Sequence, residues 1–132
     1  MMNTPADDST NPKTPKFTTV THADECAHSC GITNEGVAYT WASSTQGGNS
    51  FGQLGRGKPK GPAIRSPAPV VLQEDTNDDA THTPTIRQAF LGGSKESGHS
   101  ALLDSAGFVW LCGCDRWQQL GLGSSAAGSG GY

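Results

Sequence analysis

An internal repeat constrains the fold of this chain more than any other feature. The first copy reads HSCGITNEGVAYTWASSTQGGNSFGQLGRG over residues 28–57, and the second reads HSALLDSAGFVWLCGCDRWQQLGLG over residues 99–123. Both copies open with His-Ser, carry a glycine eight residues after the histidine and close with Gln-Leu-Gly-x-Gly. Matches in this order predict two copies of one structural unit, each of which buries its apolar face against a neighbour.

The repeated residue types indicate structural roles. Leucine is the right size to fill space between two sheets, and glycine lets the backbone turn where a side chain would clash. A glutamine amide can satisfy loop backbone groups, and a histidine can bind turn backbone through its ring nitrogens. The structural repeat positions are His28, Gly36, Trp41, Gln53, Leu54, Gly55 and Gly57 in the first copy, and His99, Gly107, Trp110, Gln119, Leu120, Gly121 and Gly123 in the second.

The apolar segments of the chain are short, and this favours an all-β fold. Runs such as VAYTW, PVVL, IRQAFL and FVWLC have the length of one strand and are bounded by turn-forming residues. The 18 glycines and eight prolines fit many short elements, and no stretch has a sustained helical period. The sequences TNEGV and DSAGF predict hairpin turns in which Gly36 and Gly107 adopt positive φ.

The pattern divides the chain into five segments. Residues 1–16 are polar and are expected to be disordered or bound to a partner, and residues 124–132 form a tail rich in glycine and serine. The repeats occupy residues 17–57 and 86–123. Residues 58–85 form a polar insertion between them, in which a basic loop precedes an acidic one.

The stretch FLGGSKESGHSALLDSAGFVWLCGCDRWQQLGLG closely resembles the repeat of the regulator of chromosome condensation (RCC-type) family. The first copy departs from that pattern, since it lacks Gly-Gly before His28 and has Ala42 where glycine is usual. The resemblance implies a β-propeller, which in this family has seven blades of four short antiparallel strands. We therefore expect a partial β-propeller of about two blades with long polar loops.

Two blades cannot close a ring, because propellers contain roughly four to eight. Their outer flanks would be covered by the rest of a longer protein, by a larger assembly or by self-association into a ring. The sequence therefore predicts a non-catalytic protein–protein interaction or scaffold module, as a subunit or fragment within a larger, multi-subunit complex. The resemblance implies an alternative, guanine-nucleotide exchange on a small Ras-like GTPase, which some family members perform with one face of a complete ring.

Two groups of residues are candidates for binding. The loop carrying Arg56, Lys58, Lys60 and Arg65 contains four cations and no acid, so it is a candidate contact for an acidic partner. Cys26, His28 and Cys30 would share one face of an extended strand, which leaves a zinc site as an alternative to plain burial. Their spacing is not that of a zinc knuckle, and we predict neither a metal nor a cofactor.

Composition excludes several function classes. A net charge of −3 argues against a general nucleic-acid binder, and no apolar run approaches the ~18 residues of a membrane span. No phosphate-binding loop, nucleophile elbow or zinc-protease motif is present, so no enzyme is predicted. Four cysteines in a chain without a secretory signal are expected to be reduced, which favours an intracellular compartment: nucleus, cytoplasm or organelle.

Overall fold

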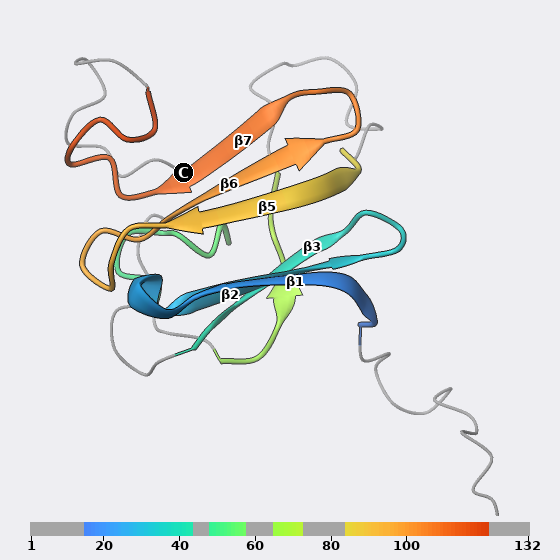
Figure 1. The fold of residues 1–132 in the computed structure, drawn as a ribbon, viewed down its shortest axis with the longest axis horizontal. Coiled ribbons are helices and arrows are strands. Elements are labelled where there is room, and N and C mark those ends of the chain that lie inside the picture. Colours follow the sequence, from blue (N-terminus) through green and yellow to red (C-terminus); the bar gives the residue numbers. More distant parts are fainter. Residues whose placement is uncertain (1–14, 44–47, 58–64, 73–83, 122–132) are drawn as a thin grey trace, which may run out of the picture.

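The computed structural model describes residues 15–43, 48–57, 65–72 and 84–121, and within them all extended structure belongs to two antiparallel sheets (Figure 1). The four-stranded sheet has the order β1-β2-β3-β4 and the three-stranded sheet the order β5-β6-β7. The strands are β1 (Phe17–Ala23), β2 (His28–Thr33), β3 (Ala38–Ala42), β4 (Ala68–Pro69), β5 (Ile86–Gly92), β6 (His99–Asp104) and β7 (Val109–Gly113), and a short 3₁₀ helix, η1 (Asp24–Cys26), joins β1 to β2.

The predicted all-β class is confirmed. Each repeat supplies the consecutive antiparallel strands of one small sheet, except for β4 of the first sheet, and the two sheets do not join into a closed ring. The sheets lie next to one another, with β5 of the second sheet beside β1 and β2 of the first (Figure 1). This arrangement is consistent with two neighbouring blades of a partial propeller, because a small sheet of this kind needs a neighbour on its apolar face.

Strand β4 comes from a segment that the sequence predicted to be an insertion. Ala68 and Pro69 pair with Thr40 and Tyr39, so part of residues 58–85 completes the first sheet. The proline is tolerated because β4 is the last strand of the sheet and one of its sides needs no ladder donor. A two-residue strand carries no period-2 pattern, so the sequence could not identify it.

Both hairpin turns adopt the predicted geometry. Gly36 has φ +78° and Gly107 has φ +93°, values that side chains rarely allow. A Cβ at Gly36 would lie 2.2 Å from the methyl group of Thr85, whereas Gly107 has open space around it. Gly36 is therefore needed for packing as well as for conformation, and Gly107 for conformation alone.

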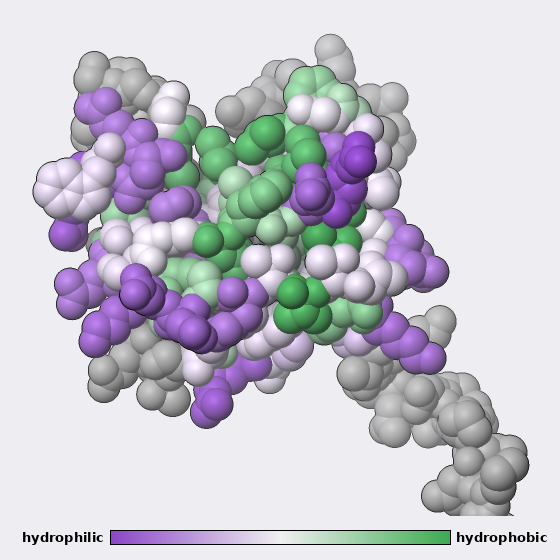
Figure 2. Space-filling model, in the orientation of Figure 1, coloured by the Kyte–Doolittle hydropathy of each residue, from purple (hydrophilic) through white to green (hydrophobic). Residues whose placement is uncertain are grey.

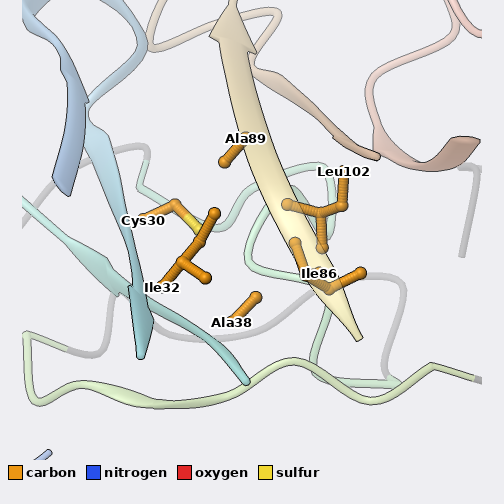
Figure 3. Close-up of a cluster of buried hydrophobic side chains, with 6 residues drawn as sticks. All are labelled: Cys30, Ile32, Ala38, Ile86, Ala89 and Leu102. Carbon is orange, nitrogen blue, oxygen red and sulfur yellow. The ribbon is translucent and has the colours of Figure 1, made fainter. Parts of the chain in front are cut away.

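The hydrophobic core lies between the two sheets (Figure 3). Side chains alternate along each strand, so one face of β2 and β3 meets one face of β5 and β6. Val70, Leu72, Leu91 and Trp110 pack around the edge of this core. The cluster itself consists of Cys30, Ile32 and Ala38 from the first sheet and Ile86, Ala89 and Leu102 from the second.

Candidate functional site

The joint between the two sheets contains the Gln-Leu-Gly turn of the first repeat. Gln53 and Leu54 are both 0% exposed, although neither belongs to a strand. The hydroxyl of Thr40 in β3 donates to the carbonyl of Leu54 over 2.6 Å, and the amide of Val71 donates to the carbonyl of Gly55. The turn is thus held by the first sheet and inserted against the second.

The two copies of the turn repeat the same hydrogen bonds. The Oε1 atom of Gln53 accepts from the amide of Phe51 at 2.9 Å, and Gln119 accepts from the amide of Trp117 at 2.8 Å. Two further bonds were not predicted: Asn49 Oδ1 accepts from the amide of Leu54 at 3.1 Å, and Asp115 Oδ1 accepts from the amide of Leu120 at 2.9 Å. The shared position, five residues before each leucine, was the available signal.

A buried hydrogen-bond chain joins the sheets beside this turn. His28 Nδ1 donates to the carbonyl of Cys26 at 2.9 Å, and His28 Nε2 lies 2.7 Å from Ser100 Oγ of the second sheet. Ser100 Oγ also donates to the carbonyl of Gln53 over 2.8 Å. Burial lowers the pKa of His28, so its ring is neutral near pH 7 and Nε2 carries a lone pair. The single hydroxyl proton of Ser100 is therefore shared between two acceptors.

The geometry behind the zinc alternative is wrong for Cys26. This residue lies in η1, and Ala27 has φ +57°, so the chain is not extended between Cys26 and His28. Both ring nitrogens of His28 have hydrogen-bond partners, and the thiol of Cys26 donates to the carbonyl of Ala23 at 3.3 Å. Across residues 15–43, 48–57, 65–72 and 84–121, no group of three His, Cys, Asp or Glu side chains is placed to hold a metal ion.

The cysteine thiols are predicted to be unreactive in the folded protein. All four cysteines are free and buried, and burial raises the pKa of Cys30 and Cys112 to about 12 from 9.0. The folded thiols keep their protons above the pKa of the unfolded thiols. The contribution of Cys30 and Cys112 to the free energy of unfolding is therefore complete below pH 9.0 and is lost as the pH rises toward about 12. We expect no labelling by iodoacetamide at pH 8 in the native state and full labelling in urea, as measured by mass spectrometry. Labelling of either residue before unfolding would contradict the expectation.

The candidate basic loop separates into residues with different environments. Arg56 folds back on the first sheet: its Nε donates to Thr40 Oγ1 at 3.2 Å and its Nη2 donates to the carbonyls of Thr40 and Ser66. Arg65 is exposed, and Lys58 and Lys60 lie outside the described residues, as does Gly123. Arg56 therefore bonds β3 to the chain at Ser66, and the described residues include no cluster of the four cations.

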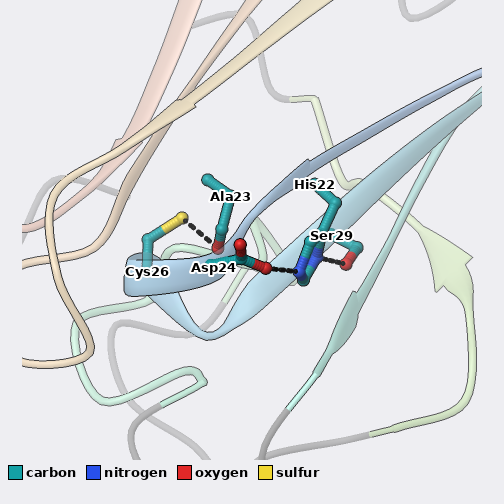
Figure 4. Close-up of polar contacts among 5 residues, drawn as sticks. All are labelled: His22, Ala23, Asp24, Cys26 and Ser29. Carbon is teal, nitrogen blue, oxygen red and sulfur yellow. Dashed lines mark hydrogen bonds and ion pairs between the residues drawn. The ribbon is translucent and has the colours of Figure 1, made fainter.

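A serine–histidine–aspartate chain lies on the first sheet (Figure 4). His22 Nδ1 is 2.8 Å from Ser29 Oγ, and His22 Nε2 is 2.7 Å from Asp24 Oδ1. A serine nucleophile needs access to its substrate, but Ser29 is only 4% exposed within β2. The aspartate is 93% exposed, so this ion pair contributes little to the stability of the fold. The chain serves to tie β1 and η1 to β2.

Each sheet has one face that does not meet the other sheet. The register places Ser29 opposite Trp41 and Gly31 opposite Tyr39 on the face of the first sheet that points away from the core. The ring of Phe17 lies over Gly31 and stacks on Trp41 at 5.5 Å. We call this surface the first outer face; its residues are Phe17, Val20, His22, Ser29, Gly31, Tyr39 and Trp41.

The corresponding surface of the second sheet is more exposed. Leu103 pairs with Val109 and Ala101 pairs with Leu111, so all four side chains lie on one face. Phe90 joins them from β5 and is 55% exposed, and Val109 is 60% exposed. Hydrophobic residues gather over β5, β6 and β7 in Figure 2. We call this surface the second outer face; its residues are Gln88, Phe90, His99, Ala101, Leu103, Val109 and Leu111.

A buried carboxylate oxygen next to the second sheet has no partner. Asp115 is 6% exposed, and while its Oδ1 holds the amide of Leu120, its Oδ2 is the one buried side-chain polar atom without a hydrogen bond among the described residues. Nearby, Trp117 is 76% exposed. A buried acceptor without a donor is costly, so an added donor here would stabilise the protein.

Within the part of the chain that the structure describes, no helix has the length and apolar character needed to cross a bilayer. No protein-family model matches the sequence, and a search of curated proteins returns no match.

Proposed function

We propose that the chain is a non-catalytic interaction module, built from two RCC-type repeats, that docks a protein partner on the second outer face. The observation that carries this proposal is the contrast between the faces of one sheet. Leu102 and Cys112 face the first sheet and are buried, whereas Val109 of the opposite face is 60% exposed. Apolar side chains gathered on a sheet face are typical of a docking surface.

Two further features support a protein as the occupant. The described strands leave the outer edge of β7 unpaired, while the matching edge of β3 carries β4. A partner can add backbone hydrogen bonds along such an edge. Trp117 is 76% exposed and offers a large aromatic contact of the kind enriched at interfaces.

The proposal is tested by charging the second outer face. Leu103→Arg places a cation among the apolar side chains of that face, while Glu35→Arg changes an exposed turn residue and serves as the control. We expect wild type and Glu35→Arg to retain the same stoichiometric partners on affinity purification from cells that express the chain, and Leu103→Arg to lose them. Retention of all partners by a folded Leu103→Arg would contradict the proposal.

The same preparations test the exchange-factor alternative. That activity would require the isolated chain to accelerate the release of labelled nucleotide from a small Ras-like GTPase. Among the described residues, no cluster of the four basic-loop cations is present, and the two sheets do not form a closed ring. We therefore expect no acceleration, and an increase in the release rate would favour the alternative.

A further inference from the structure

We infer that the occupant of the second outer face is the first outer face of another copy of the same chain, so that copies associate head to tail. This inference rests on the proposed docking function and names its partner. Its basis is that each sheet has two faces. The two inner faces pack on each other, which we call the mated joint, and the two outer faces, which we call unmated, have no neighbouring sheet among the described residues.

The mated joint shows which residues meet. His28 opens β2 on one side, and Ser100 follows the first residue of β6 on the other, with 2.7 Å between Nε2 and Oγ. The apolar part of the joint brings Cys30 and Ile32 against Ala89 and Leu102. The contact therefore has a polar end, made by histidine and serine, and an apolar remainder.

The unmated faces carry the same polar pair in the same register. His99 opens β6 as His28 opens β2, and Ser29 follows His28 as Ser100 follows His99. His99 Nδ1 lies 3.4 Å from the carbonyl of Ser97, where the matching distance from His28 Nδ1 to the carbonyl of Cys26 is 2.9 Å, and no described residue bonds His99 Nε2. Ser29 is 4% exposed and its Oγ already meets His22, so its correspondence with Ser100 is one of register and not of an open hydroxyl.

The apolar parts of the two faces also correspond. Ala101 and Leu103 occupy on β6 the register positions that Cys30 and Ile32 occupy on β2. On the receiving side, Tyr39 takes the position of Trp110, and Val20 takes that of Ala89. The side chains of the strand pairs include the polar Gln88 on the second outer face and His22 on the first but no Lys, Arg, Asp or Glu, so packing the faces together buries hydrophobic surface without burying an unpaired ion.

The contact joins two different surfaces, the second outer face of one copy and the first outer face of the next. Heterologous contacts of this kind generate rings or open chains rather than closed pairs.

The test combines two blocking variants. Leu103→Arg blocks only the second outer face and Val20→Arg only the first. Val20 is 56% exposed and Leu103 is half-buried, so the folding of both variants is checked by urea unfolding. We expect the purified wild-type chain to increase in mass with concentration in light scattering and sedimentation, as does the control Glu35→Arg. Each blocking variant alone is expected to be a monomer, with the dissociation constant raised about tenfold or more.

Mixing the two blocking variants is the decisive step. Each retains one intact face, so the mixture is expected to form a dimer containing one copy of each and to grow no further. Self-association of Val20→Arg with no gain on mixing would show a face-to-face dimer and overturn the inference. If a variant does not unfold cooperatively, hydrogen exchange of the wild type decides: protection of residues 17–41 and 99–113 that rises with concentration supports the contact, and unchanged exchange overturns it.

A monomeric wild type would also overturn the inference, and a dye then separates this failure from that of the proposed function. A monomer whose second outer face binds anilinonaphthalene sulfonate, with binding lost in Leu103→Arg, keeps an apolar docking surface for a different protein. A monomer that binds no dye through that face contradicts both the self-association and the proposed docking function.

Discussion

Replacement of Leu54 by alanine is expected to lower the free energy of unfolding by about 2–5 kcal/mol. The side chain is 0% exposed and lies in the turn that is inserted between the two sheets, so its removal leaves a cavity that neighbouring strands cannot fill. The backbone bonds from Thr40 and to Asn49 involve only main-chain atoms of Leu54, so the substitution leaves them available. Urea unfolding followed by circular dichroism measures the change.

Phe108→Ala is the matched control for this substitution. It also removes a large apolar side chain, but Phe108 is 68% exposed at the second hairpin, so its loss is expected to cost less than about 1 kcal/mol. A Leu54→Ala variant as stable as Phe108→Ala would show that the turn is not part of the core. Since folded domains are stable by only about 5–15 kcal/mol, the expected loss at Leu54 is a large fraction of the total.

The repeat indicated both closing turns, because each of them buries its leucine and accepts a backbone hydrogen bond through its glutamine. Leu54 and Leu120 are 0% and 3% exposed, and the glutamines before them accept matching backbone bonds. The all-β class followed for a similar reason, since short apolar runs between turn residues cannot form long helices. Local patterns were therefore sufficient for the sheets and for their closing turns.

Features that depend on tertiary contacts were not predictable from the same patterns. The 3₁₀ turn at Asp24–Cys26 breaks the alternation that the zinc alternative assumed, and a left-handed Ala27 has no sequence signature. Arg56 was grouped with exposed cations, but its stem and guanidinium lie on β3 because carbonyls of Thr40 and Ser66 are within reach. Ser100 was visible only as the serine of the second His-Ser pair, and its bond to His28 spans 72 residues.

The two histidines of the repeat illustrate how one sequence position acquires two environments. His28 is fully buried because a second sheet covers it, whereas His99 is half-buried on the second outer face. The difference arises from the neighbour and not from the repeat itself. For this reason we propose that a partner binds the second outer face and not the repeat motif itself.

Acidification is expected to weaken the joint through His28. Burial lowers the pKa of this ring below its ordinary 6.5, so the unfolded chain binds a proton more readily than the folded chain does. The stabilising contribution is therefore complete above the unfolded pKa of about 6.5 and is lost as the pH falls from there toward the folded pKa. Each unit by which the pKa is lowered makes the loss about 1.4 kcal/mol larger.

The measurement is the difference in unfolding free energy between wild type and His28→Asn from pH 8 to pH 5, in which the contributions of the other histidines cancel. We expect wild type to be the more stable protein at pH 8, by about 2–4 kcal/mol, because the substitution removes a buried ring and leaves Ser100 and the carbonyl of Cys26 without their partner. The difference should shrink on acidification. A difference that instead grew would show that the imidazolium is the favoured form, since a second ring proton donated to Ser100 frees the serine proton for the carbonyl of Gln53. The direction of the slope therefore reports whether burial or hydrogen-bond satisfaction dominates at the joint.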